Sequence, residues 1–389
     1  MYKVLTLNNI SVSGLERLPR DKYEVASEIQ HPDAILLRSF TMHDMDIPET
    51  LKAVGRAGAG VNNIPIDKMS QRGIPVFNAP GANANAVKEL VVAGMLLASR
   101  NICQAWNYTD KLEGDAAALS KQVEAGKKKY AGFELPGRTL GVVGLGAIGI
   151  RVANVALSLG MRVIGYDPQI TVKGAWQLAA DVEHAHSVDD MVSRCDFISF
   201  HVPLVDATRN MLNAERVAVM KKGAVVLNFA RDGIVDEEAV CKALDAGKLY
   251  AYVTDFPSGS LNGHERVIAL PHLGASTAEA EDNCAIMVAE QIKDFLENGN
   301  ITHAVNFPEV VMPRANNIGS RLAVANSNVP NMVGQISTAL ADAGLNIVDM
   351  LNKSKGDIAY TLADVEGEVA DVVVERIKAI DGVLSVRVL

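Results

Sequence analysis

A glycine-rich turn between two short apolar segments places the narrowest restriction on how this chain folds. The segment Thr139–Val143 is apolar and β-branched, as expected of a strand buried in a parallel sheet. The turn Gly144-Leu145-Gly146-Ala147-Ile148-Gly149 follows, and a helical stretch over 150–159 closes at Gly160. The segment Met161–Tyr166 then predicts a second strand. Together these elements predict a βαβ unit.

Each glycine of the turn has a separate use in such a unit. Gly144 allows the tight turn, Gly146 lets the backbone approach a pyrophosphate, and Gly149 lets the helix pack closely on its strand. The N-terminus of the helix supplies the anion site. The string alone is a weak signal, but here it follows a strand and opens a helix. We therefore predict a dinucleotide-binding site.

The carboxylate of Asp167, 18 residues after Gly149, indicates which dinucleotide binds. It stands at the carboxyl end of the second strand, where it can accept hydrogen bonds from the ribose hydroxyls of adenosine. A 2′-phosphate would meet like charge there, with no nearby arginine to offset it. NAD is therefore favoured over NADP as the cofactor.

Length and charge restrict the remaining possibilities. At 389 residues the chain exceeds one typical core and predicts two or three domains. The net charge of −9 argues against general binding to nucleic acid or to an anionic membrane. The apolar run 90–98 is too short to span a bilayer, and no signal peptide precedes Tyr2. We expect a cytoplasmic protein.

The four cysteines are interpreted as buried free thiols in a reducing compartment. They are far apart, form no CxxC pair and give no metal-ligand spacing, so we predict no metal site. They are Cys103, Cys195, Cys241 and Cys284.

Periodicity predicts an α/β protein with alternating strands and helices. In the first hundred residues we expect strands at 4–7, 34–37, 53–56 and 75–78, separated by helical stretches. An apolar helix over 87–100 leaves this region, and a polar, alanine-rich arm or interface element covers 107–132. Further strands are expected at 197–202, 224–229, 251–255 and 267–270, which gives a doubly wound sheet. A long amphipathic helix over 278–298 is expected to carry the chain back to the first domain, leaving an active-site cleft between the two.

The last seventy residues follow a different pattern. After a linker rich in proline and asparagine at 305–319, strands are expected at 321–326, 346–353, 358–365 and 383–389. Helices are expected at 331–343 and 369–379. This βαββαβ order predicts a ferredoxin-like module.

Three polar clusters follow predicted strands of the doubly wound sheet, at 228–233, 254–256 and 271–277. Ligands bind at the carboxyl edge of an open parallel sheet, so the clusters can converge on one cofactor. Oxidation of a secondary alcohol needs a base for the hydroxyl proton and a cation for the substrate's carboxylate and forming carbonyl. His272 suits the first role and Arg231 the second. A loop histidine and a structural salt-bridge arginine are the alternatives.

Several strings resemble the D-isomer-specific 2-hydroxyacid dehydrogenase family. They cover residues 1 to about 300, and the most specific is Pro271-His272-Leu273-Gly274-Ala275-Ser276-Thr277. The others are 37–39, 56–63, 78–81, 144–149, 201–204, and Arg231 with 233–236.

The resemblance, taken with the C-terminal module, implies oxidation of 3-phosphoglycerate to 3-phosphohydroxypyruvate with NAD, the entry step of serine synthesis. It places Arg38, Ser39 and Gly60 at the substrate, with Lys127 reaching the phosphate from a neighbouring subunit of a homo-oligomer. It implies that the cofactor is lined by Ala59, Gly144, Gly146, Ala147, Ile148, Gly149, Asp167, Val202, Phe229, Ala230, Asp255, Gly274 and Ala275. Asp255 would lie near the nicotinamide carboxamide.

This chain departs from the family at the partner of its histidine. Members usually carry a glutamate a few residues after the strand that ends at Asp255, where it raises the basicity of the histidine. Here that segment reads Asp255-Phe256-Pro257-Ser258-Gly259-Ser260. Asp232, which replaces a common glycine, Glu265 and a substrate phosphate oxygen remain open as partners of His272.

The C-terminal module resembles an ACT regulatory domain, which in this family binds serine where two modules pair. Asn328 and Asn346 match the ligand-contacting asparagines, and an amide can bind both the carboxylate and the ammonium of L-serine. Turn chemistry alone is the alternative for both. Asn326 stands in place of a histidine and Asn331 in place of a glycine.

The expected division is a discontinuous substrate-binding domain at 1–96 and 284–305, an NAD-binding Rossmann domain at 97–283, a linker at 306–319 and the ACT domain at 320–389. Three other interpretations stay open. They are a glyoxylate or hydroxypyruvate reductase, an NAD-sensing binding protein of the same fold, and an ACT module that serves only dimerisation.

Overall fold

The computed structural model describes residues 1–314 and 319–389, and it divides into two compact units. Unit 1 combines Met1–Asn83 with Ala278–Leu389, and unit 2 is Ala84–Thr277. The α/β fold class is confirmed, with two parallel sheets and a C-terminal sheet whose strands are antiparallel.

Unit 2 is built on a fully parallel seven-stranded sheet in the order β12-β11-β10-β9-β6-β7-β8. Its strands are β6 (Thr139–Val143), β7 (Arg162–Tyr166), β8 (Glu183–His184), β9 (Phe197–Phe200), β10 (Ala224–Asn228), β11 (Leu249–Thr254) and β12 (Val267–Ala269). Its helices are α3 (Ala84–Ser99), α4 (Ile102–Asp110), α5 (Ala116–Gly126), α6 (Ala147–Ser158), α7 (Val172–Gln177), α8 (Val188–Arg194), α9 (Ala214–Val219) and α10 (Glu237–Asp245), with 3-10 turns η1 (Lys127–Tyr130) and η2 (Asp206–Thr208). The order reverses between β6 and β9, which is the switch point where parallel sheets bind ligands.

Every residue of β6, β9 and β10 is buried, because helices cover both faces of the sheet. Two apolar clusters, one against α8 and α10 and the other against α3 and α6, fill the space between the sheet and its helices. The short edge strand β8, with both residues exposed, was not expected from the sequence. It carries polar side chains that give no strand pattern.

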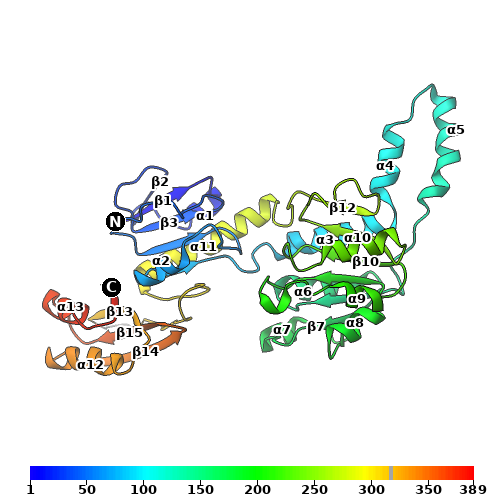
Figure 1. Cartoon of the computed structure of the whole chain (residues 1–389). Helices are drawn as coiled ribbons and strands as arrows, with labels where there is room; N and C mark the ends of the chain where they lie inside the picture. The colour runs from blue at the N-terminus through cyan, green and yellow to red at the C-terminus, as the bar shows by residue number, and fades with distance from the viewer. Residues whose placement is uncertain (315–318) are drawn as a thin grey trace. The chain divides into compact units, whose positions relative to one another are not determined.

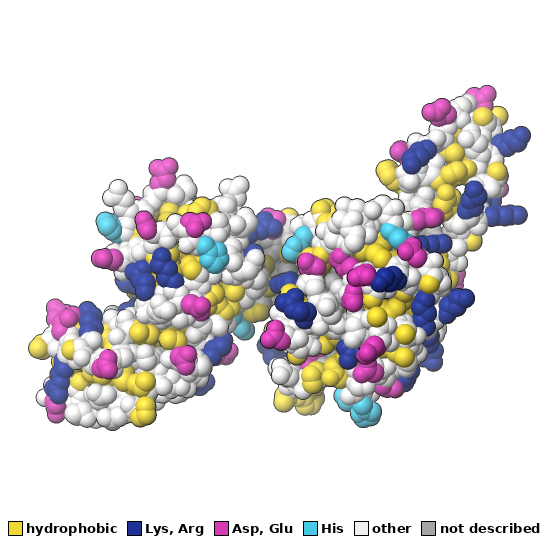
Figure 2. Space-filling view, viewed as in Figure 1, with side chains coloured by type: hydrophobic (Ala, Val, Ile, Leu, Met, Phe, Trp, Pro, Cys, Tyr) yellow, Lys and Arg dark blue, Asp and Glu magenta, His cyan; other side chains and the backbone are white. Residues whose placement is uncertain are grey.

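The segment predicted as a polar arm forms a helical hairpin of α4 and α5 that projects from unit 2 (Figure 1). Neither α4 nor the apolar side chain of Trp106 on it is buried. Lysines and arginines cluster over this region in Figure 2. Three of the lysines are consecutive in η1.

Unit 1 contains a parallel sheet in the order β2-β1-β3-β4-β5, with the long helix α11 packed against it. The elements are β1 (Tyr2–Leu7), α1 (Val12–Leu15), β2 (Tyr23–Ala26), β3 (Ala34–Leu37), β4 (Ala53–Arg56), α2 (Ile66–Gln71), β5 (Val76–Phe77) and α11 (Ala278–Asn298). The bounds of α11 agree with the prediction. The expectation of a helix between every pair of strands is wrong at 38–52, where the chain is irregular. Strand β2 was missed.

The C-terminal part of unit 1 confirms the βαββαβ order. Its elements are β13 (Ser320–Ser327), α12 (Met332–Asp342), β14 (Ile347–Lys355), β15 (Ile358–Val365), α13 (Asp371–Lys378) and β16 (Val383–Val388), with the sheet order β14-β15-β13-β16. Asn331, the residue that replaces a glycine, has φ 66°. Asparagine tolerates this left-handed conformation better than most residues, so the replacement costs little. The linker prediction for 305–319 falls partly on 315–318, outside the described residues.

The C-terminal sheet is joined to the rest of unit 1 through the end of α11. Arg321, fully buried, donates to both carboxylate oxygens of Asp364 at 2.6 and 2.7 Å and to the carbonyls of Asn298 and Met312. Arg387 donates to the carbonyls of Phe295 and Leu296. The last helix turn leaves carbonyls without intrahelical partners, and these arginines satisfy several of them.

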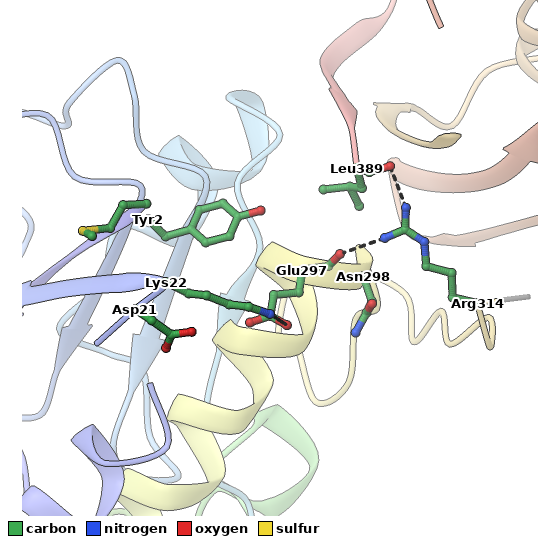
Figure 3. Close-up of a pocket in the computed structure, with 8 residues that line it drawn as sticks. Tyr2, Asp21, Lys22, Glu297, Asn298, Arg314 and Leu389 are labelled. Carbon is green, nitrogen blue, oxygen red and sulfur yellow. Dashed lines mark hydrogen bonds and ion pairs between the residues drawn. The ribbon is translucent and has the colours of Figure 1, made fainter. Parts of the chain in front are cut away.

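A surface pocket of about 460 Å³ lies beside this junction. Figure 3 shows Arg314 between the carbonyls of Glu297 and Leu389, while Lys22 pairs with the Glu297 carboxylate. One face of the C-terminal sheet, with Ala323 and Leu362, shares an apolar core with β1 and α11. The two sheets of unit 1 are therefore packed together rather than tethered by a linker alone.

Candidate functional site

The glycine turn has the geometry that its sequence predicts. Gly144 has φ 89°, and a Cβ there would lie 2.6 Å from the carbonyl oxygen of His201. A Cβ on Gly149 would lie 1.8 Å from the carbonyl oxygen of Gly144. At Gly146, the N-cap of α6, a Cβ would meet no described atom within 4 Å. The first and third glycines are thus required by the fold, whereas the second faces open space that a ligand can enter.

Asp167 lies directly after β7 and beside the glycine turn. Its two carboxylate oxygens accept hydrogen bonds from the backbone nitrogens of Leu145 and Gln169, each at 2.8 Å. These bonds fix the carboxylate at the carboxyl edge of the sheet, at the tip of the turn. A carboxylate oxygen can accept more than one bond, so both remain able to receive a ribose hydroxyl. The residues present therefore fit a dinucleotide.

His201 follows β9 on the other side of the switch point. Its Nε2 lies 2.8 Å from Ser199 Oγ, and its Nδ1 is buried without a hydrogen-bond partner among the described residues. Burial lowers the pKa of His201 to about 3, so the imidazole is neutral at physiological pH. The sequence pattern gave His201 no role beyond its place in the string 201–204. The apolar run before it gave no sign of an unsatisfied ring nitrogen.

The loop that carries Arg231 is held by Asn228, the last residue of β10. The Asn228 side chain is buried, donates to the carbonyl of Arg231 at 2.9 Å and accepts from the nitrogen of Ala230 at 3.2 Å. The exposed Arg231 guanidinium donates to the carbonyl of Ala230 and forms no ion pair with the described residues, Asp232 included. The structural salt-bridge alternative for Arg231 thus has no support.

His272 lies three residues beyond the end of β12, and Asp255 occupies the strand end between Arg231 and His272 in the sheet order. Asp255 is 1% exposed and accepts from the nitrogens of Leu273 and Gly274 at 2.7 and 2.8 Å. His272 itself is exposed and has φ 54°. Because β10, β11 and β12 are parallel neighbours, the structure brings Arg231 and His272 to one edge of one sheet.

The other cofactor residues expected in unit 2 occupy the same edge. Val202 follows β9, and Ala147 and Ile148 open α6. Phe229 and Ala230 are buried, and the Phe229 ring packs close to Gly94 of α3. Gly274 is buried and Ala275 half-buried in the loop after His272.

The expected substrate residues Arg38 and Ser39 follow β3 in unit 1. The Arg38 guanidinium forms an ion pair with Glu281 of α11 at 2.6 Å, and neither side chain is buried. The Arg38 carbonyl accepts from Arg56 and Asn63, and the Ser39 nitrogen donates to Asn8. Glu281 was not predicted, because nothing in its helical pattern indicates that it reaches Arg38.

The remaining expected residues are Ala59, Gly60, Lys127, Asn328 and Asn346. The carbonyl of Ala59 accepts from Asn78, and Gly60 next to it is half-buried in unit 1. Lys127 is exposed in η1 and pairs with Glu124. In the C-terminal module Asn328 donates at 3.0 Å to the carbonyl of Gly356, a residue 28 positions further along the chain. The carbonyl of Asn346 accepts from the nitrogen of Glu366.

The four cysteines are free, as predicted. Cys195 and Cys284 are buried, but the expectation of burial is wrong for Cys103 and Cys241, which are half-buried. Burial raises the pKa of the Cys195 thiol to about 12, so it stays protonated and unreactive. Among the described residues, no helix combines the length and apolar character needed to cross a membrane.

Comparison with known proteins gives consistent matches. Residues 92–274 match the NAD-binding domain of the D-isomer-specific 2-hydroxyacid dehydrogenases. The D-3-phosphoglycerate dehydrogenase of Methanocaldococcus jannaschii is 36% identical over 352 residues, which cover 88% of this chain and 63% of that protein. The Haemophilus influenzae enzyme of the same name is 33% identical, over 95% of this chain and 89% of its own length.

A solved structure extends this likeness to the fold. It is the NAD⁺-bound 3-phosphoglycerate dehydrogenase of Entamoeba histolytica, which is 27% identical and has a TM-score of 0.61. The match covers 78% of this chain and 98% of that one. The glycine turn, the carboxylate of Asp167 and these relatives agree, and the chain belongs to the D-isomer-specific 2-hydroxyacid dehydrogenase family, in the group of the D-3-phosphoglycerate dehydrogenases.

Proposed function

We propose that this protein oxidises 3-phosphoglycerate to 3-phosphohydroxypyruvate with NAD, the first step of L-serine biosynthesis. The observation that carries the proposal is that Arg231, His272 and the dinucleotide turn all follow strands at the carboxyl edge of the unit 2 sheet. Relatives named D-3-phosphoglycerate dehydrogenase at 33–36% identity support the choice of substrate.

The chemistry divides among a few residues. When held by the glycine turn and Asp167, NAD would supply the hydride acceptor for the carbon that bears the hydroxyl group. His272 accepts the hydroxyl proton as the carbonyl forms, since an imidazole has a pKa near neutrality. Arg231 binds the substrate carboxylate and polarises the forming carbonyl through its planar pair of donors. The Arg231 guanidinium, which forms no ion pair with the described part of the chain, supports this role.

We assign the cofactor to the domain at 97–283, with Ala59 as an expected lining residue from outside it. We assign the substrate phosphate to the domain formed by 1–96 and 284–305. Arg38, Ser39 and Gly60 would bind the substrate there. Lys127 would add a cation from a neighbouring subunit, which makes the active protein a homo-oligomer. The exposed η1 lysines support this arrangement. We also propose a cytoplasmic location. The four free cysteines support it, because free thiols are typical of a reducing compartment.

We propose regulation by L-serine through residues 320–389, with Asn328 and Asn346 as ligand contacts. The βαββαβ module supports this, and the Asn328 side chain already donates to the carbonyl of Gly356, a bond that an effector would have to share or displace. Titration calorimetry with L-serine, and initial rates with and without it, decide the matter. No heat and no change in rate would leave the module as a dimerisation element.

The test of the main proposal is steady-state turnover of NADH with 3-phosphohydroxypyruvate and of NAD with 3-phosphoglycerate. We expect turnover that falls at least about a hundredfold in H272A, because general base catalysis contributes roughly 10²–10⁴-fold. NAD affinity should stay close to that of wild type. Absence of turnover with tight NAD binding would point instead to an NAD-sensing binding protein.

One observation favours a second candidate, a glyoxylate or hydroxypyruvate reductase. Arg38, the expected phosphate ligand, is already neutralised by Glu281. The variant R38A separates the two candidates. If the phosphate binds at Arg38, this variant should weaken the binding of phosphorylated substrates far more than that of unphosphorylated ones. If it does not, the binding of both should weaken alike.

A further inference from the structure

The structure leaves His272 without the acidic partner that this family usually supplies. Among the described residues, no carboxylate forms a hydrogen bond or ion pair with the His272 imidazole, and this includes both candidates, Asp232 and Glu265. The glutamate position lies in the segment 256–260, which holds serines and a glycine. Another feature must therefore hold the ring.

The aromatic ring of Phe256 contacts the His272 imidazole directly. The ring centroids are 5.2 Å apart and the planes meet at 61°, a tilted geometry that aromatic pairs favour. Phe256 is half-buried, and its backbone nitrogen donates to the hydroxyl of the fully buried Thr254 at 3.2 Å. Phe256 is thus fixed to the end of β11.

The backbone of the His272 loop is attached to the same strand end. The nitrogen of His272 donates to the carbonyl of Asp255 at 3.1 Å, and the Asp255 carboxylate binds the next two backbone nitrogens. With the backbone of His272 held at φ 54°, the remaining freedom of the residue lies in its side-chain torsions. The Phe256 ring restricts those torsions.

The chain beyond Phe256 is held by a residue of α10. The hydroxyls of Ser258 and Ser260 both donate to one oxygen of Glu237, at 2.6 and 3.0 Å. Glu237 opens α10, so the segment is bound to the helix that packs against this part of the sheet. The Glu237 carboxylate therefore anchors the loop at 256–260.

We infer that Phe256 is a positioning residue for the reaction, which orients the His272 imidazole by ring contact in place of the usual carboxylate. The inference rests on the proposed role of His272 as the base. It also assigns a purpose to the departure from the family's sequence: the loop is held by Glu237 and presents an aromatic ring to the histidine.

The test compares F256A, F256L and F256Y in the full-length protein with NAD and 3-phosphoglycerate. We expect kcat to fall about tenfold in F256A, the factor that corresponds to the upper range of an aromatic pair, with the KM for NAD nearly unchanged. F256Y keeps the ring and should restore kcat, whereas F256L fills the volume without a ring and should not. The plot of kcat against pH should keep its shape in F256Y and change in F256A.

Phe133 offers a matched control in the same unit. It is half-buried and contacts Tyr250 with ring centroids 5.2 Å apart and planes at 67°. F133A loses a similar aromatic pair away from the histidine. It should lower the melting temperature at least as much as F256A does, while leaving kcat and its pH dependence as in wild type.

A second readout does not depend on activity. Diethyl pyrocarbonate modifies exposed imidazoles, and mass spectrometry reports the rate at His272. We expect faster modification in F256A and a wild-type rate in F256Y. Equal kcat and equal modification rates in wild type and F256A would overturn the inference, as would equal kcat in F256L and wild type. If the wild-type protein oxidises no 2-hydroxy acid, the proposed function fails, and the modification rates alone still decide whether Phe256 holds the ring.

Discussion

The ion pair between Arg38 and Glu281 sets the electrostatics of the expected phosphate site. Any anionic group that binds Arg38 must displace the Glu281 carboxylate or share the guanidinium with it. Both side chains reach solvent, so the pair itself adds little to stability. The ion pair matters instead for substrate binding, because an anionic substrate competes with Glu281 for Arg38.

We therefore predict that E281Q lowers the KM for 3-phosphoglycerate by roughly two- to fivefold, the factor that an exposed ion pair of 0.5–1 kcal/mol corresponds to. The value of kcat should hardly change. Initial rates at varied substrate concentration and ionic strength check this. A rise in KM would mean that Glu281 orients Arg38 for binding.

His201 gives the folded state a defined sensitivity to acid. Burial lowers its pKa to about 3, whereas in the unfolded chain an imidazole titrates near 6.5. Between these values the unfolded chain binds a proton that the folded protein excludes, so stability falls as pH decreases through this window. The full contribution of His201 is retained above about pH 6.5.

Replacement of His201 by Asn should make the unfolding free energy less dependent on pH between about 6.5 and 4. Urea denaturation at pH 7 and at pH 5 measures the difference for wild type and variant. The same loss of stability in both proteins between these pH values would show that other groups cause it.

At the scale of elements, the turn between β6 and α6 contains one glycine that the fold requires and another that the cofactor would require. Gly149 lies against the Gly144 carbonyl, and Gly146 faces open space. Helix α6 can begin beside β6 only because no side chain stands at Gly149. Gly146, the glycine that would approach the ligand, does not pack against another part of the described chain.

The variants G146A and G149A should consequently behave differently. G149A should lower the melting temperature and abolish NAD binding, because its Cβ would overlap a backbone oxygen. G146A should keep the wild-type melting temperature and raise the KM for NAD, since its methyl group occupies ligand space. Thermal unfolding together with NAD titration distinguishes the two. Equal melting temperatures for both variants would contradict this assignment.

At the scale of the molecule, the buried Arg321 helps to make the C-terminal module a part of unit 1. Arg321 donates two bonds to Asp364 and another to the carbonyl of Asn298 at the end of α11. The two charges are stable in the interior only as a pair. A lone buried charge is left if either partner is removed.

R321A should lower the free energy of unfolding by about 3–5 kcal/mol, the usual cost of breaking a buried pair. The exposed pair of Arg376 and Asp342 in the same module provides the control, and R376A should stay within about 1 kcal/mol of wild type. Urea denaturation measures both. Similar small losses in the two variants would mean that Arg321 is not needed to join the sheets.

The local pattern of the chain was sufficient to predict the dinucleotide turn and the long helix α11. The apolar run before Gly144, the glycine spacing and Asp167 identify the dinucleotide turn, because each depends on neighbours within thirty residues. The bounds of α11 agree with those read from its amphipathic pattern. Short exposed strands such as β8 escaped prediction, because a two-residue polar strand leaves no periodicity.

Contacts between distant residues could be known only from the folded chain. Two examples are the ion pair of Arg38 with Glu281 and the ring contact of Phe256 with His272. No sequence pattern indicates that either pair of residues is in contact. The sequence showed that the usual glutamate is missing but not what holds the histidine instead. Side-chain pairing depends on how strands and helices converge in space, and periodicity specifies only which face of an element is buried.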